Sequence, residues 1–177
     1  MNEIELRFPN EKDRIIVMDY LEEHYKRGEN SLNGVGGLDR LNDFDKWIEK
    51  IRNDLSEETV SKERVPATLY LAIRKLDNKL VGTIQIRHKL NERLLAHGGH
   101  IGYGVRPLER RKGYAKQMLK LALEKCKELE IKKALITCDK DNIGSRKTIL
   151  ANGGKMENEV EENGKIVQRY WINLEEW

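Results

Sequence analysis

Apolar and polar positions along the first half of the chain follow the periods of strands and amphipathic helices. From Asp43 onward, for example, Phe44, Trp47, Ile48 and Ile51 recur at spacings of three and four, which is typical of a helix with one buried face. Asp77-Asn78 separates two apolar runs and predicts a hairpin turn. The predicted elements of this half are a strand at Ile4–Phe8, helices at Glu11–Tyr25 and Asp43–Leu55, and paired strands at Thr68–Ile73 and Leu80–Ile86.

The second half continues the alternation of strands and helices. Its longest helix, Tyr114 to Leu129, places Met118, Ala122 and Cys126 on one apolar face. The remaining predicted elements are strands at His100–Val105, Ala134–Cys138, Lys155–Val160 and Ile166–Ile172, and a helix at Asn142–Ala151. The order is therefore β-α-α-β-β-β-α-β-α-β-β, without a linker or an internal repeat.

Composition narrows the class of protein. The 177 residues are 38% hydrophobic and 36% charged with a formal net charge of +3, which fits one domain spanning residues 1–177 and gives no reason to expect a nucleic-acid partner. No apolar run approaches eighteen residues and Met1 to Glu5 lacks the order of a signal peptide, so we expect a cytoplasmic protein without a membrane partner. Cys126 and Cys138 occupy apolar positions and are predicted to be buried, reduced thiols.

The segment from Gly104 to Ala115 carries the strongest functional signal. A strand ending at Val105 meets Pro107, and the cations Arg110, Arg111 and Lys112 lead through Gly113 into the long helix. The first amides of a helix have no intrahelical partner and lie at the positive end of its dipole, so this position favours an anion. Three clustered cations suit a diphosphate.

The spacing Arg110-x-x-Gly113-x-Ala115 resembles the acyl-CoA signature of the GCN5-related N-acetyltransferase (GNAT) superfamily. Val105-Arg106-Pro107 before it, and the helix, strand and Asn142 after it, match the same family pattern. The resemblance covers essentially the whole chain. It implies an α/β fold in which a mixed central sheet carries a helix layer on each face.

The resemblance also implies a cofactor site for acetyl-CoA between the strands before and after the motif, and no metal. The Val105 main chain would bind the pantetheine or thioester carbonyl, and Asn142 would bind the pantetheine. The implied pyrophosphate-binding residues are Arg110, Arg111, Lys112, Gly113, Tyr114 and Ala115, with Lys116 as a neighbour that could reach the pyrophosphate. Ser145 lies where the family often has a small residue that faces the cofactor. The two histidines of His97-Gly98-Gly99-His100 resemble a pair of metal ligands. No third ligand lies near them in the sequence, which favours a loop.

Catalysis requires a base for the amine and an acid for the leaving thiolate. The family often places a Tyr seven residues after the Asn, where this chain has Ile149. Tyr103, Tyr114, Tyr170 or solvent are the remaining candidates for the acid, and Tyr103 lies on the central strand. His100 has a suitable intrinsic pKa for the base, although the adjacent glycines equally favour a structural hydrogen bond.

Two functions remain open from the sequence. One is an N-acetyltransferase acting on a primary amine of a small molecule or peptide by direct acyl transfer, as a monomer or homodimer. The other is a catalytically degenerate CoA-binding module with a sensing or scaffolding role. Ile149 in place of the family's Tyr favours this second function slightly, whereas the intact cradle from Arg110 to Ala115 with Asn142 favours the first more. Acceptor choice is expected to depend on the loops Gly28–Leu41 and Leu90–Gly99, and the first of these is either a lid or a surface linker.

Overall fold

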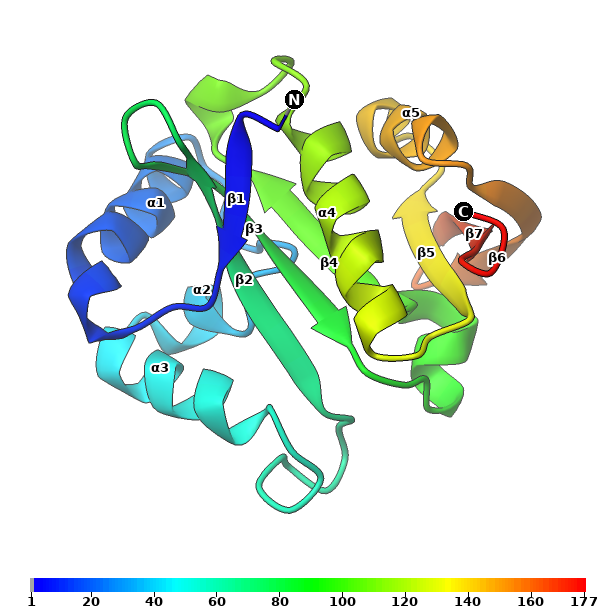
Figure 1. The fold of residues 1–177 in the computed structure, drawn as a ribbon, viewed down its shortest axis with the longest axis horizontal. Coiled ribbons are helices and arrows are strands. Elements are labelled where there is room, and N and C mark those ends of the chain that lie inside the picture. Colours follow the sequence, from blue (N-terminus) through cyan, green and yellow to red (C-terminus); the bar gives the residue numbers. More distant parts are fainter. Residues whose placement is uncertain (1) are drawn as a thin grey trace.

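The protein is described by a computed structural model that covers residues 2–177 and contains two antiparallel sheets with helices on both sides (Figure 1). The strands of the described part are β1 (Ile4–Arg7), β2 (Ala67–Arg74), β3 (Lys79–Arg87), β4 (Ile101–Val105), β5 (Lys133–Asp139), β6 (Lys155–Glu162) and β7 (Lys165–Asn173). Its helices are α1 (Arg14–Lys26), α2 (Leu38–Leu41), α3 (Phe44–Asn53), α4 (Tyr114–Glu128) and α5 (Ile143–Ala151). Three shorter elements complete it: the 3₁₀ turns η1 (Glu11–Asp13) and η3 (Pro107–Glu109), and the π-helical turn η2 (Leu94–Gly98).

The strands are divided between the two sheets at the boundary of β4 and β5. One sheet has the order β1-β2-β3-β4 and the other has the order β5-β7-β6. All strand pairs within the described residues are antiparallel. β4 and β5 are therefore edge strands of different sheets, although they lie beside one another. The predicted order of strands and long helices is confirmed. The predicted mixed central sheet is corrected to two antiparallel sheets, because no ladder joins β4 to β5 among the described residues.

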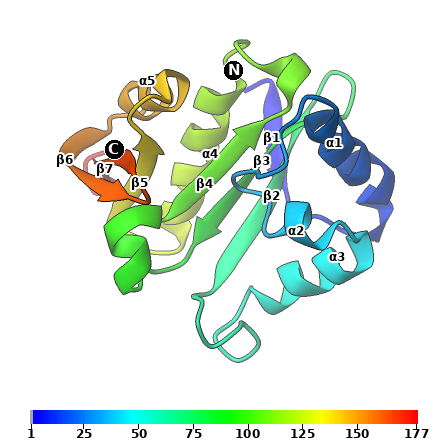
Figure 2. The ribbon, with the colours of Figure 1, turned by 180° about the vertical axis from the view of Figure 1, so that it is seen from behind.

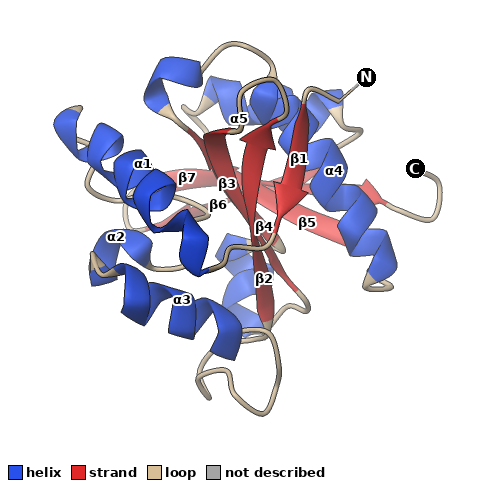
Figure 3. Cartoon of the chain, turned by 60° about the vertical axis from the view of Figure 1, so that its left-hand side comes forward, coloured by secondary structure: helices blue, strands red, loops and turns tan. Residues whose placement is uncertain are grey.

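Helices cover both faces of the four-stranded sheet, as predicted (Figure 3). On one face, α4 packs against β1, β3 and β4 with its apolar side, and α5 lies next to α4. On the other face, α1 and α3 pack over a second cluster that includes Tyr20, Trp47 and Leu71, each at most 1% exposed. The sheet thus separates two hydrophobic cores, and β4 is positioned between them.

Local sequence explains where several elements begin and end. Asp43 accepts a hydrogen bond from the Lys46 amide and caps α3, as its short polar side chain predicts. Asn163 and Gly164 both have positive φ values (51° and 80°) and close the two-residue turn between β6 and β7. The predicted buried thiols are confirmed, since Cys126 and Cys138 are both free and buried.

The segment Gly28–Leu41 differs from the flexible loop that its glycines suggest. It contains α2, and Val35 and Leu38 are only 3% and 1% exposed. The Trp47 indole donates a hydrogen bond of 2.7 Å to the Val35 carbonyl, and the Leu32 amide donates to the Asp39 carboxylate at 2.9 Å. Glycine composition signals conformational freedom but does not show these tertiary contacts, so the second half of the loop is anchored to the core.

Candidate active site between β4 and β5

Hydrogen bonding along β4 directs part of its main chain toward β5. The Arg87 amide donates to the His100 carbonyl and the Arg106 amide donates to the Val81 carbonyl, both at 2.7 Å. Hydrogen-bonded positions alternate in an antiparallel pair, so the even-numbered residues of β4 bond to β3. The main-chain groups of Tyr103 and Val105 consequently point away from β3, toward β5.

The same alternation on β5 directs Thr137 toward β4. The Leu174 amide donates to the Lys132 carbonyl at 2.8 Å and the Lys140 amide donates to the Ile166 carbonyl at 2.9 Å, which assigns the even-numbered residues of β5 to β7. Leu135 and Thr137 therefore face the other way. Polar main-chain groups of the two edge strands line a common gap, which we call the β4–β5 gap.

His100 closes one end of the β4–β5 gap. Its amide donates to the Leu135 carbonyl at 2.7 Å, and the Leu135 amide donates to its Nδ1 atom at 2.9 Å. Because Nδ1 accepts, the neutral ring carries its proton on Nε2 and has no lone pair left for an amine. Burial, helped by the nearby Arg87 charge, lowers the pKa of His100 to about 4. This geometry does not favour His100 as the catalytic base, because the side chain, 6% exposed, joins the two sheets.

The anion cradle predicted from the sequence lies beyond the other end of β4. After η3, Arg111 and Gly113 have φ values of 62° and 85°, and Gly113 is the N-cap residue of α4. A Cβ atom at Gly113 would meet none of the described residues within 4 Å, so this backbone faces open space. Tyr114, Ala115 and Lys116 form the first turn of α4, where amides lack intrahelical acceptors. The turn thus offers main-chain donors to an anion, as the sequence predicts.

The four cations of this segment differ in what they contact. Arg110 forms a bidentate ion pair with Glu29 (2.8 and 2.6 Å), so the expectation that its guanidinium binds phosphate does not fit the geometry. Lys112 pairs with the buried Glu109 at 3.0 Å. Arg111 and Lys116 are exposed side chains, and neither forms an ion pair with a described residue. We retain Arg111, Lys112 and Lys116 as candidates for phosphate contact.

Asn142, Ser145 and Tyr103 lie together beside the β4–β5 gap. The Asn142 side chain caps α5 by accepting a hydrogen bond from the Ser145 amide at 3.1 Å. The hydroxyl groups of Ser145 and Tyr103 are 2.7 Å apart, so they bridge α5 and β4. Burial raises the pKa of Tyr103 to about 12, despite its hydrogen bond with Ser145. Tyr103 therefore stays protonated at neutral pH and can donate a hydrogen bond.

The other candidate acids are engaged in the core. The Tyr170 hydroxyl donates to the Gln168 side chain at 2.8 Å, and Tyr170 is 2% exposed. The Tyr114 hydroxyl accepts from Arg74 at 3.1 Å, and Tyr114 is 7% exposed. Ile149 is completely buried and belongs to the core around α4. Tyr103 is consequently the candidate tyrosine best placed to act at the gap.

Glu29 is the site residue that the sequence analysis missed. It follows α1 and is 81 positions from Arg110, so neither motif spacing nor periodicity connects the two. The loop that begins here continues to Gly34, whose added Cβ would lie 2.6 Å from the Gly102 carbonyl and from the Tyr103 Cα. The loop between α1 and α2 therefore crosses the sheet on the side opposite α4 (Figure 2).

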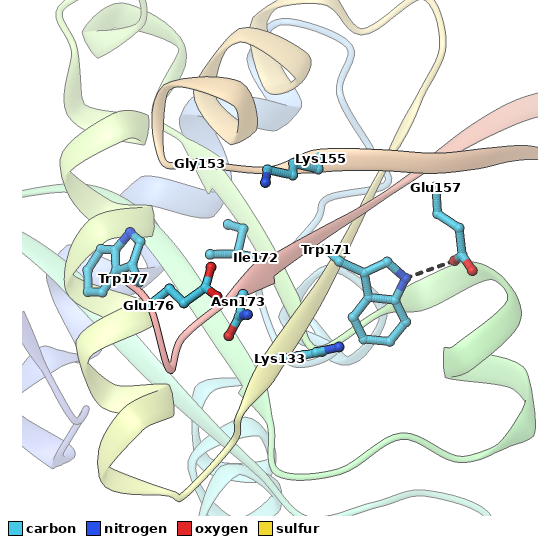
Figure 4. Close-up of a pocket in the computed structure, with 9 residues that line it drawn as sticks. All are labelled: Lys133, Gly153, Lys155, Glu157, Trp171, Ile172, Asn173, Glu176 and Trp177. Carbon is cyan, nitrogen blue, oxygen red and sulfur yellow. Dashed lines mark hydrogen bonds between the residues drawn. The ribbon is translucent and has the colours of Figure 1, made fainter.

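A separate cavity of about 660 Å³ lies outside the β4–β5 gap. It is lined by residues including Lys133, Trp171 and Trp177 (Figure 4). Lys133 begins β5, far along the strand from the cradle side of the gap.

Within residues 2–177, no three His, Cys, Asp or Glu side chains are grouped to hold a metal ion, and no helix has both the length and the apolarity to cross a membrane.

Two neighbouring edge strands of different sheets beside an anion cradle fit the arrangement that the resemblance to acyl-CoA-dependent acyltransferases implies. The sequence model of the acetyltransferase (GNAT) family matches residues 38–153, more than half of the chain. The chain therefore belongs to the GNAT acetyltransferase family, whose reaction is acetyl-CoA-dependent N-acetylation. No curated protein matches it significantly.

Solved structures of similar fold cover nearly all of the chain. RimJ from Mycobacterium smegmatis, solved with a CoA disulfide, has a TM-score of 0.74 at 17% identity, with 98% of this chain and 83% of that chain covered. A ribosomal-protein-S5-alanine acetyltransferase from Vibrio fischeri has a TM-score of 0.71 at 14% identity, covering 100% and 96%. A spermidine N-acetyltransferase chimera that includes the Vibrio cholerae enzyme has a TM-score of 0.67 at 15% identity, covering 99% and 98%. These similarities confirm the predicted fold class.

Proposed function

We propose that this protein transfers the acetyl group of acetyl-CoA to a primary amine of a small molecule or peptide by direct transfer. The observation that supports it best is the β4–β5 gap, because the Val105 and Thr137 main chains face away from their own sheets toward it and the cradle of α4 lies beside it. Main-chain donors at Val105 and at the first turn of α4 would hold the thioester and the diphosphate. Fixed donors of this kind stabilise negative charge as it develops.

In the proposed reaction, the neutral amine nitrogen forms a bond to the acetyl carbon as the carbon–sulfur bond breaks. The amine loses one proton and the thiolate gains one. Since His100 has no free lone pair, solvent is the proposed acceptor of the amine proton. Tyr103, held beside Ser145, would donate a hydrogen bond to the leaving sulfur. A hydroxyl with a pKa near 12 is a weak proton donor to a thiolate, so solvent would supply the proton in most turnovers.

The acceptor is proposed to enter beside the loop that follows α1. This loop reaches β4 at Gly34 on the face opposite α4. The α4 side of the gap is therefore available for the cofactor. Similar folds carry out acetylation of a ribosomal-protein alanine and of spermidine, so acceptor classes differ widely on this scaffold. Segments 28–33 and 90–99 are the parts of the chain we expect to select the amine.

The experiment is a panel of amines with acetyl-CoA, in which free thiol is followed continuously and the acetylated product is identified by mass spectrometry. Peptides with different N-terminal residues and polyamines form the first two groups. Thiol release that depends on one amine class and yields its acetyl product supports the proposal. Tight acetyl-CoA binding without amine-dependent release across the panel would instead favour the degenerate CoA-binding module.

A further inference from the structure

The Arg110 side chain connects the end of β4 to the end of α1. Its Nε donates to the Val105 carbonyl at 3.1 Å, while Nη1 and Nη2 donate to the two Glu29 oxygens at 2.8 and 2.6 Å. All three contacts use the planar fork of the guanidinium, which a lysine could not reproduce. Arg110 is thus committed to two protein partners in the cradle.

Glu29 is itself held from the other side. His24, whose side chain is 4% exposed, places Nδ1 2.9 Å from a Glu29 oxygen. The Arg110 hydrogen bond, together with the weaker influence of His24, lowers the pKa of Glu29 to about 2. The carboxylate is therefore ionised at neutral pH and can only accept, so His24 carries its proton on Nδ1. Glu29 has one defined orientation between the imidazole and the guanidinium.

The Glu29–Arg110 contact affects the site because it joins the end of β4 to the start of the loop that follows α1. Val105 directs its main chain into the β4–β5 gap, and its carbonyl orients the peptide that leads to η3. Glu29 begins the loop that crosses β4 at Gly34. A single side chain therefore fixes the thioester-binding strand end relative to the loop on the acceptor side.

We propose that the Glu29–Arg110 pair is a positioning device that orients Val105 toward the acetyl thioester and sets the acceptor loop against β4, rather than a phosphate-binding site. The inference rests on the proposed function, because it concerns the same gap. The pair is partly exposed, with side chains 34% and 44% accessible. Partly exposed ion pairs contribute little to stability, so variants at both positions should fold.

Two acetyl donors separate positioning from phosphate binding. S-Acetylpantetheine has the thioester and the pantetheine arm of acetyl-CoA but no diphosphate. If Arg110 acts through Val105, then Arg110→Ala and Glu29→Gln should weaken the binding of both donors by a similar factor, about fivefold. The matched control is Arg111→Ala, the adjacent exposed cation, which should weaken acetyl-CoA binding more than S-acetylpantetheine binding.

Binding is measured by calorimetry on each variant after its melting temperature has been compared with that of the wild type. The double variant Glu29→Gln/Arg110→Ala should bind both donors no more weakly than the weaker single variant, because both changes remove one contact. Turnover with an active amine should show a larger KM for that amine in Glu29→Gln. Loss confined to acetyl-CoA in Arg110→Ala, or unchanged binding and KM in Glu29→Gln, would overturn the positioning role.

The binding measurements with the two acetyl donors do not require a known acceptor. Wild-type protein that binds both donors but acetylates no amine would contradict the proposed function and leave the donor comparison valid. Wild-type protein that acetylates an amine, beside a Glu29→Gln variant with the same constants, would contradict only the pair. The two failures are therefore distinguishable.

Discussion

The two ends of the β4–β5 gap use the same edge strands in opposite ways. At the closed end, His100 and Leu135 exchange two hydrogen bonds, and an added Cβ at Gly99 would lie 2.5 Å from the Leu135 carbonyl. At the open end, the Val105 main chain faces the gap, and Gly113 faces open space. Polar groups are satisfied internally where the sheets are joined and directed outward where a ligand is expected.

This difference separates structural from functional polar residues. His100 is polar, titratable and on the central strand, which are the properties of a candidate base, yet each of its contacts is with protein. Gly113 carries no chemistry, yet its backbone conformation shapes the open end. Residue type alone therefore ranks these two positions in the wrong order for function.

The largest expected effect is at the open end. Gly113→Val should weaken acetyl-CoA binding at least ~100-fold, about 3 kcal/mol, because the side chain would occupy the space the diphosphate needs and a β-branched residue is strained at positive φ. Calorimetry checks this. Gly164→Val is the matched control: Gly164 has φ +80° and likewise no described atom within 4 Å of an added Cβ. Equal acetyl-CoA affinities in the two variants would contradict the cradle.

The next effect is at the closed end and concerns stability. His100→Ala should lower the free energy of unfolding by about 2 to 3 kcal/mol, because it leaves a cavity and an unpaired Leu135 amide. Chemical denaturation measures it. Acetyl-CoA affinity of the folded variant should change much less than in Gly113→Val, and a comparable loss would show that the two ends do not differ as described.

Lowering the pH should remove the contribution of His100 to stability. The folded-state pKa of His100 is about 4 against an ordinary value of 6.5, so the unfolded chain takes up this proton first as pH falls. The contribution of His100 is complete above pH 6.5 and is lost between about pH 6.5 and 4. His100→Asn keeps an acceptor near the Nδ1 position without titrating, and its melting temperature should fall less over that interval. Parallel curves for the two proteins would contradict the buried neutral ring.

A smaller effect distinguishes the cations of the cradle. Arg111→Ala should weaken acetyl-CoA binding about fivefold at low salt and flatten its dependence on ionic strength, because an exposed cation acts through screened attraction. Lys112→Ala should do less, since Lys112 is already paired with Glu109. Titrations at several salt concentrations test the order, and an unaltered slope in Arg111→Ala would exclude its contact with phosphate.

The smallest effect is expected at Tyr103. Tyr103→Phe should lower kcat about threefold, because a hydrogen bond to the leaving sulfur is lost while solvent still supplies the proton. The pH–rate profile between pH 6 and 9 should keep its shape, since Tyr103 titrates near pH 12. Tyr170→Phe, which alters a buried hydroxyl bonded to Gln168, is the comparison. A loss of a hundredfold or more in Tyr103→Phe would make Tyr103 the general acid.

The sequence predicted what depends on contiguous residues. The cradle from Val105 to Ala115 and the Asn142 cap lie within short segments, so motif and helix signals suffice to locate them. The roles of His100 and Arg110 depend on Leu135 and Glu29, which approach only in the folded chain. The turn at Leu94–Gly98 and the short α2 lie in segments without clear periodicity, and both were expected as loops. These contacts are tertiary, so neither motif spacing nor periodicity in the sequence reports them.

Gly34 has a practical consequence for redesign of this enzyme. Its backbone touches β4 so closely that no side chain fits, while Glu29 is fixed by His24 and Arg110. Residues 30–33 therefore lie between two fixed contacts, and within them the Leu32 amide is bonded to Asp39. If this loop selects the amine as proposed, libraries at the other three positions would alter which amine is accepted while keeping these contacts, whereas substitutions at Gly34 would push the loop away from β4.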